Sequence, residues 1–229
     1  MIEWLAAHWA EVLGFATGAV CVVLAGRRNV WNYPIGIANN LVFLVLFATS
    51  GLYAAAALQV VYLAFGAHGW WRWTRGVEHD PGFIARTPRR QAAWLVVAGV
   101  AGTAVLWWVL STFTDSQVAL ADAATTAASL VAQYLLNRKR IENWAVWIAV
   151  DVAFVGLAIA TGLWITAVLY AGFIVICAVS LRSWLRVERE QRASAVAGSG
   201  AAGSDAAGWD AAGSDAAGSD APERVPSGG

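Results

Sequence analysis

The chain has 229 residues, of which 59% are hydrophobic and only 13% are charged. Its mean hydropathy is +0.57, and 15 basic residues balance 15 acidic ones. A soluble domain of this length would need more charge to cover its surface, so an ordinary soluble protein is excluded. We predict an all-α integral membrane protein, and its 14 tryptophans suggest interfacial anchors or stacking surfaces.

Seven apolar runs follow one another, each near the roughly 20 residues that a helix needs to cross a bilayer. We place these runs at 4–25, 33–49, 52–71, 92–113, 118–136, 144–160 and 163–181. Glu3, His8 and Glu11 interrupt the first run, so we do not expect a cleavable signal peptide. Only Ser50-Gly51 separates the second and third runs, which predicts tightly packed antiparallel neighbours.

The basic residues set the expected orientation. They follow the first, third, fifth and seventh runs, and with seven spans all four groups lie on one face. The positive-inside rule then puts the N-terminus outside and the C-terminus in the cytoplasm of a cell inner membrane. Residues 1–192 hold 14 basic and 10 acidic residues. This excess suits anionic lipid, and nothing in it indicates nucleic-acid binding.

The membrane part contains a repeat whose two copies align at a constant offset, without a gap. Leu24-Ala25-Gly26-Arg27-Arg28 aligns with Leu135-Leu136-Asn137-Arg138-Lys139, and Gly51-Leu52 aligns with Gly162-Leu163. Each copy covers three spans and one span separates the copies, so the two units should be parallel. Such repeats occur in transporters, with the substrate site between them near mid-membrane. The domains would be 1–75, a loop and linker helix at 76–114, and 115–192.

The last segment, 193–229, repeats Gly-Ser-Asp-Ala-Ala with small variations. A tract of glycine, alanine, serine and aspartate buries too little apolar surface to order itself. We predict a disordered cytoplasmic tail without an assigned role.

Polar residues inside the apolar runs are the candidates for function, because unpaired polar groups are costly in a bilayer. In the sixth run Asn143, Trp147 and Asp151 recur at spacings of four, which predicts one helical stripe. The other candidates are Trp144 beside this stripe, and Asn39, Asn40, Gln59, Tyr62, Asp122, Gln133 and Tyr170 in other runs.

These residues have more than one interpretation. They could be interhelical hydrogen bonds between the repeats, or Asp122 and Asp151 could relay protons. Asp122 could also be a structural partner near its helix end. Together, amides, hydroxyls and acids beside indole and phenol rings favour a cavity for a neutral or cationic aromatic ligand.

Enzymatic and metal-dependent functions find no support in the sequence. It contains no HExxH, Gly-x-Ser-x-Gly or Walker A motif. Cys21 and Cys177 lack ligand spacing with a histidine or with each other. We therefore expect neither a catalytic site nor a cofactor nor a metal.

Several stretches resemble the PnuC family of vitamin transporters. They are Asn32-Tyr33-Pro34-Ile35-Gly36, Leu58-Gln59-Val60-Val61-Tyr62, Gly69-Trp70-Trp71-Arg72-Trp73, Leu169-Tyr170 and, most specific, Glu142-Asn143-Trp144-x-x-Trp147 with Asp151. The resemblance covers about residues 14–184. It implies a three-plus-one-plus-three helix fold similar to the SWEET sugar transporters, often a homo-oligomer such as a trimer. It also implies nicotinamide riboside uptake by facilitated diffusion, with trapping by cytoplasmic phosphorylation.

Three hypotheses follow. The first is a nicotinamide riboside uniporter, with the ring stacked on Trp144, Trp147 or Tyr170. The second keeps the fold but carries thiamine or another nucleoside, or couples transport to protons. The third is a non-transporting membrane receptor or assembly subunit, in which the polar residues only hold the helices together.

Overall fold

The computed structural model describes residues 9–51, 53–76, 79–80, 83–114 and 118–216. Within them the chain is all-α, as the sequence predicts, and a single isolated bridge joins Ala85 to Arg140. The helices are α2 (Trp9–Gly26), α3 (Asn32–Thr49), α4 (Tyr53–Arg75), α5 (Arg89–Phe113), α6 (Ala119–Asn137), α7 (Glu142–Ala160) and α8 (Trp164–Ala216). They match the seven predicted runs, although residues 1–8 of the first run lie outside the described residues.

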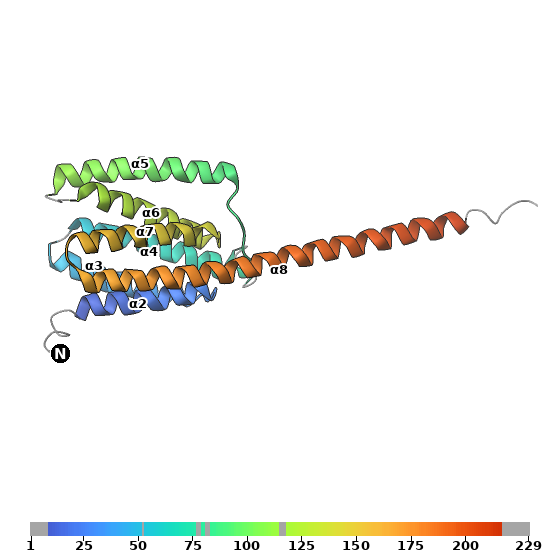
Figure 1. Cartoon of the computed structure of the whole chain (residues 1–229), viewed down its shortest axis with the longest axis horizontal. Coiled ribbons are helices and arrows are strands. Elements are labelled where there is room, and N and C mark those ends of the chain that lie inside the picture. Colours follow the sequence, from blue (N-terminus) through green and yellow to red (C-terminus); the bar gives the residue numbers. More distant parts are fainter. Residues whose placement is uncertain (1–8, 52, 77–78, 81–82, 115–117, 217–229) are drawn as a thin grey trace, which may run out of the picture. The chain divides into compact units, whose positions relative to one another are not determined.

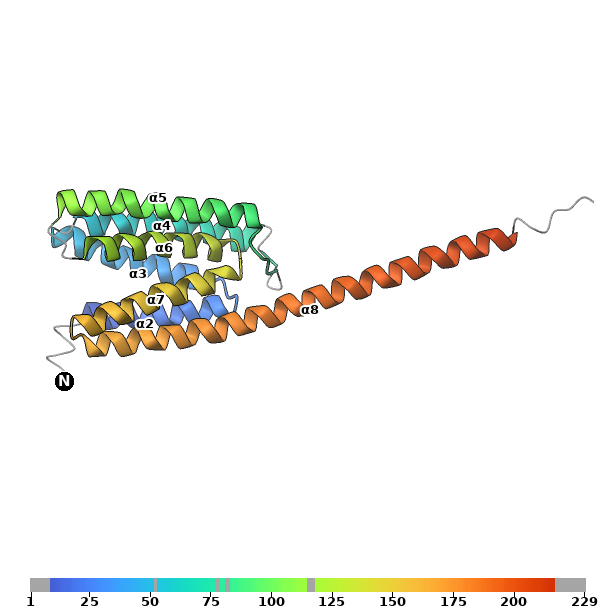
Figure 2. The ribbon, with the colours of Figure 1, turned by 45° about the horizontal axis from the view of Figure 1, so that its top comes forward.

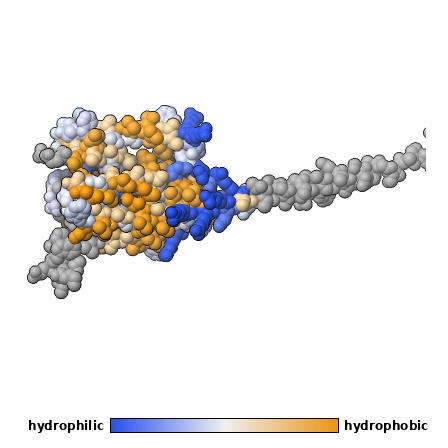
Figure 3. Space-filling model, viewed as in Figure 1, coloured by the Kyte–Doolittle hydropathy of each residue, from blue (hydrophilic) through white to orange (hydrophobic). Residues whose placement is uncertain are grey.

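The helices up to residue 187 run alongside one another in one bundle (Figures 1 and 2). α6 has eight buried residues and is central, whereas α5 has none and lies at an edge beside α6. The arginines that end α4, together with Arg28 and Arg138 in the turns after α2 and α6, mark one end of the bundle, here called the basic end. Figure 3 shows hydrophilic residues gathered there next to an apolar body.

The apolar body fits a bilayer. By length and composition, four helical segments can cross a membrane: α3, α5, α7 and the Trp164–Ala195 part of α8. α2 contributes a shorter apolar stretch, Leu13–Gly26. α4 and α6 are more polar because they carry Gln59 and Gln133, which face the interior of the bundle. Their polarity is therefore compatible with a place inside a membrane protein.

The turns of the two copies of the repeat have the same backbone conformations. Gly51 and its equivalent Gly162 both have positive φ, 76° and 75°, a conformation that glycine adopts without strain. Arg28 and Lys139, also equivalent in the repeat, have φ of 58° and 47°. The hydrogen bonds agree, since Asn29 N donates to Leu24 O at 2.8 Å and Arg140 N donates to Leu135 O at 2.9 Å. Equivalent sequences thus form equivalent turns.

The chain divides into two compact units after residue 187. In the second unit α8 continues to Ala216, which differs from the disordered tail that we expected over 193–229. Alanine is the best helix former, and this segment is rich in it, which accounts for the helix. Residues 217–229 lie outside the described residues.

Candidate functional site

A cavity of about 520 Å³ lies inside the bundle, a size typical of sites for small molecules. Five helices besides α6 contribute to its wall, and α5 is not among them. Its lining is Gly14, Phe15, Gly18, Cys21, Val22, Ala25, Asn32, Tyr33, Gly36, Ile37, Asn39, Asn40, Phe43, Phe47, Gln59, Tyr62, Gly66, Gln133, Leu136, Trp144, Trp147, Tyr170 and Phe173. The wall is mostly apolar and aromatic, with a few amide and phenol groups.

The cavity lies where the two predicted three-helix units meet. Twelve lining residues form six pairs whose members are equivalent in the repeat: Val22 and Gln133, Ala25 and Leu136, Tyr33 and Trp144, Gly36 and Trp147, Gln59 and Tyr170, and Tyr62 and Phe173. Equivalent positions of both units therefore face the same space. The paired side chains differ, so the wall is chemically asymmetric.

Four buried aromatic residues at the basic end, here called the tryptophan clamp, are Tyr33 and Trp144, which line the cavity, and Trp73 and Trp184, which do not. Trp73 donates its indole N–H to Asn137 O at 3.2 Å, and Trp184 donates to Gly26 O at 2.9 Å. Tyr33 packs edge-on against Trp73 at 5.2 Å and 84°, and Trp144 against Trp184 at 5.4 Å and 87°. Both halves of the clamp thus have the same geometry.

Asn137 organises one half of the clamp. It is 1% exposed, and its Oδ1 accepts hydrogen bonds from the Tyr33 hydroxyl at 3.1 Å and from Gln133 Nε2 at 3.0 Å. Its Nδ2 donates to Phe65 O at 2.8 Å. The amide nitrogen of Gln133 is thus held by Asn137, one turn later on α6.

The opposite part of the cavity is aromatic. Tyr170 stacks on Phe154 with ring centroids 4.7 Å apart, and it meets Phe15 edge-on at 5.7 Å. Phe173 lies 6.1 Å from Phe15. Sequence reasoning missed the phenylalanines, but the repeat could have found Phe173, because it is the partner of Tyr62.

Eight of the eleven predicted site residues line the cavity together. These are Asn39, Asn40, Gln59, Tyr62, Gln133, Trp144, Trp147 and Tyr170. The Thr17 hydroxyl donates to Asn39 Oδ1 at 2.9 Å. Among the described residues, Gln59 Oε1 and Trp144 Nε1 are buried without a hydrogen-bond partner. An acceptor and a donor are thus left unpaired on residues of the cavity wall.

Three predicted site residues lie outside the lining. Asn143 is 0% exposed and donates from Nδ2 to Arg140 O at 2.6 Å, so it stabilises the turn before α7, as Asn32 does before α3. Asp122 lies in the first turn of α6, where the helix dipole favours an acid. Asp151 is 6% exposed and accepts a 3.8 Å contact from the Cys177 thiol.

The position of Asp151 along α7 accounts for its absence from the lining. Around the helix it lies roughly 20° from Trp144 and roughly 40° from Trp147, which both face the cavity. It lies about one turn beyond Trp147, where it contacts the Cys177 thiol of α8.

Comparison with known proteins agrees with this architecture. A family described as nicotinamide mononucleotide transporter matches residues 8–186. The chain belongs to this family. Members of the family are transporters and not enzymes, so the protein is an integral membrane transporter for a small molecule.

Individual relatives of the family differ in what they carry. The chain is 26% identical to the nicotinamide riboside transporter PnuC of Escherichia coli, over 82% of this chain and 90% of the relative. It is 27% identical to the riboflavin/roseoflavin transporter RibM of Streptomyces davaonensis, over 80% and 88%. A crystal structure of the vitamin B3 transporter PnuC has the same fold, with a TM-score of 0.63, 22% identity, and coverage of 82% of this chain and 85% of that one.

Proposed function

We propose that this protein takes up nicotinamide riboside by facilitated diffusion, with phosphorylation in the cytoplasm trapping the substrate. The observation that carries the proposal is the asymmetric cavity. At equivalent positions, one side has Gly36 and Gln59 where the other has Trp147 and Tyr170. A ligand with an aromatic ring and a carboxamide fits such a wall in one orientation only.

Each part of nicotinamide riboside has a partner in this cavity. The pyridinium ring is flat and positively charged, so it would stack on Trp147 or Tyr170 with a cation–π contribution. Its carboxamide offers a donor and an acceptor, which complement the amides of Asn39, Asn40 and Gln59. The ribose hydroxyls would bond Gln133 and Tyr62. These contacts use most of the polar residues of the lining. Binding of the substrate would therefore not need a carboxylate from the protein.

The transport cycle would be alternating access. We propose that residues 1–75 and 115–192 rock about the cavity while 76–114 link them. The basic end would face the cytoplasm, with the N-terminus outside, because cytoplasmic loops carry the excess of arginine and lysine. A homo-oligomer such as a trimer is also part of this proposal.

Proteoliposomes containing the purified protein test the mechanism. We expect labelled nicotinamide riboside to equilibrate across the membrane without a proton or sodium gradient. We also expect unlabelled substrate preloaded inside to exchange with labelled substrate outside at a rate that neither gradient changes. Accumulation above equilibrium under either gradient would contradict facilitated diffusion. It would direct attention to Asp122 or Asp151 as the coupling group.

Riboflavin is the second candidate, because the riboflavin/roseoflavin transporter matches the chain about as closely as the nicotinamide riboside transporter does. Its flat ring system would also suit the aromatic wall. Competition for binding among nicotinamide riboside, riboflavin, thiamine and deoxynucleosides separates the candidates. Stronger competition by riboflavin than by nicotinamide riboside would replace the proposed substrate while leaving the transporter assignment in place.

A further inference from the structure

We propose that a groove between α5, α6 and α7 binds an anionic glycerophospholipid, with one acyl chain in the groove and the phosphate against Arg89 and Arg90. The groove has a volume of about 610 Å³ and shares no lining residue with the substrate cavity. Its wall follows α5 from Ala92 to Trp107 and α6 from Leu120 to Leu135, and α7 adds its first turns.

Small side chains form the hollow. On α6 the wall includes Leu120, Ala124 and Ala128, one stripe at spacings of four. Beside the groove α5 packs against α6, since a Cβ on Gly99 would meet Val131 Cγ2 at 3.7 Å and one on Gly102 would meet Ala127 Cβ at 3.7 Å. The small residues of both helices leave the apolar groove next to this contact.

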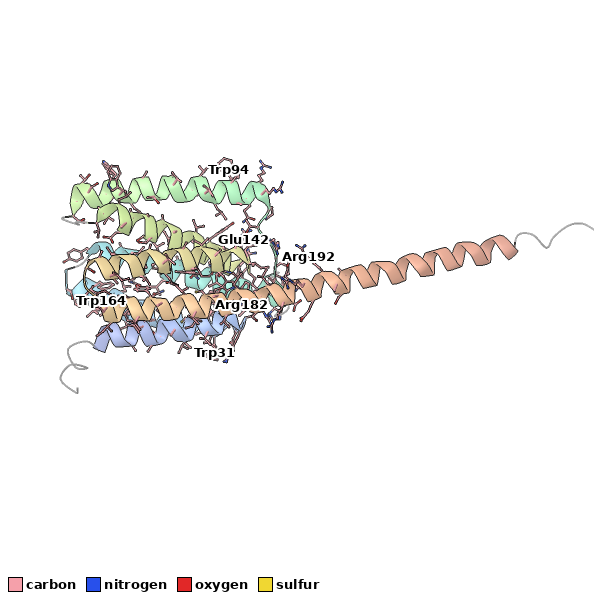
Figure 4. The ribbon with its side chains drawn as sticks, viewed as in Figure 1. Trp31, Trp94, Glu142, Trp164, Arg182 and Arg192 are labelled. Atoms are coloured by element: carbon pink, nitrogen blue, oxygen red, sulfur yellow. The ribbon has the colours of Figure 1, made fainter. Side chains whose placement is uncertain are left out.

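The polar groups of the groove are already bonded within the protein. The Thr103 hydroxyl donates to Gly99 O at 2.9 Å. Glu142 Oε2 accepts from the Thr87 amide at 3.0 Å and from its hydroxyl at 2.7 Å. The groove thus offers hydrocarbon contact, which suits an acyl chain better than a polar solute. Thr87 and Glu142 lie in the groove wall at the basic end, where Figure 4 shows Glu142 at the start of α7.

The groove faces the bilayer. α5 has no buried residue, and Val96 and Val100 are each 66% exposed although they line the groove. Figure 4 shows Trp94 of the same helix pointing away from the bundle. From Ala92 to Trp107 the helix rises roughly 22 Å. One leaflet occupies about half of the roughly 30 Å hydrocarbon core, so a single acyl chain fits along the groove.

Positive charge at the mouth selects an anionic headgroup. Arg89 is three residues before Ala92 and seven before Val96, so it lies on the helix face that lines the groove. Arg89 and Arg90 are both exposed. Pro88 precedes them without a side-chain cap, so amide groups of the first turn add partial positive charge. The negative charge of a lipid phosphate at this position would offset the positive charge of the two arginines at the membrane surface.

Native mass spectrometry of the delipidated full-length protein tests the proposal. The probes are phosphatidylglycerol and phosphatidylcholine with identical acyl chains. We expect phosphatidylglycerol to bind preferentially, and the double variant R89Q/R90Q to weaken its binding by roughly tenfold. The matched control R182Q/R186Q removes two exposed arginines from α8 and should change this binding by less than about twofold. Both variants should retain transport, which shows that they fold.

A second variant tests the acyl-chain part. Ala128→Leu narrows the groove without changing charge, and we expect it to weaken the binding of both lipids. Equal phosphatidylglycerol binding by R89Q/R90Q and by the unmodified protein would overturn the headgroup assignment. A change of oligomeric mass in Ala128→Leu, with lipid binding unaltered, would show that a second copy of the chain fills the groove and would overturn the proposal.

Discussion

Trp73 and Trp184 make the same hydrogen bond from equivalent positions of the repeat, and each reaches across the bundle to the other unit. Trp73 belongs to the first predicted three-helix unit and bonds the carbonyl of Asn137 in the second. Trp184 belongs to the second and bonds the carbonyl of Gly26 in the first. Gly26 and Asn137 are themselves aligned with each other in the two copies. Two equivalent hydrogen bonds thus cross between the two predicted units.

Replacing either tryptophan by phenylalanine should destabilise the protein. Trp73→Phe or Trp184→Phe leaves a buried carbonyl without its donor, which costs about 1–3 kcal/mol. We expect each variant to melt roughly 5 °C lower than the unmodified protein in the same detergent. The control Trp94→Phe changes a residue that is 65% exposed on α5 and should leave the melting temperature unaltered. Equal melting temperatures for Trp73→Phe and Trp94→Phe would contradict the importance of the clamp.

Gly69 is required for the close approach of α4 to the clamp. A Cβ at this position would collide with the Tyr33 ring and with Asn137 Oδ1. We expect Gly69→Ala to cost about 1–3 kcal/mol and to reduce transport. Gly156→Ala is the matched control on α7, since its Cβ meets nothing within 4 Å. That control should be neutral or slightly stabilising, because alanine favours helix. The melting temperature of Gly69→Ala should be lower than that of Gly156→Ala. Equal melting temperatures, or the reverse order, would contradict the prediction.

Trp147 should contribute a large part of the substrate affinity. Trp147→Ala removes the ring at the position where the other unit has Gly36, and we expect nicotinamide riboside binding to weaken by roughly tenfold. Trp147→Phe keeps an aromatic face and should recover most of the affinity. Isothermal titration calorimetry on purified protein measures both values. Undiminished binding by Trp147→Ala would rule out stacking on this residue.

Asp151 should contribute little to substrate affinity, although its spacing from Asn143 and Trp147 made it a candidate site residue. It contacts Cys177 and does not line the cavity. We therefore expect Asp151→Asn to keep the affinity for nicotinamide riboside within about twofold, because no direct ligand contact is lost. The dissociation constants of Asp151→Asn and Trp147→Ala for nicotinamide riboside, measured under the same conditions, test this prediction. A loss as large as that of Trp147→Ala would place the carboxylate next to the substrate in another state of the transporter.

Apolar run lengths and turn residues were sufficient to predict the seven helices and the turns at Gly51 and Gly162. The repeat was visible because equivalent turns carry matching residues, such as Gly51 and Gly162, whose positive φ favours glycine. Three predicted site residues, Asn143, Asp122 and Asp151, do not line the cavity. Their surroundings depend on contacts with other parts of the chain, such as the contact of Asp151 with Cys177 on α8, which periodicity alone does not show. Asn143 could have been recognised from Asn32, which makes the same bond at the other copy.

The placement of both clamp bonds at one end bears on the proposed alternating access. Both bonds cross between the two predicted three-helix units at the basic end. In the proposed cycle, separating the units at this end would break both bonds, whereas separating them at the far end would leave both in place. Opening at the basic end would therefore cost about 1–3 kcal/mol for each buried carbonyl that loses its donor.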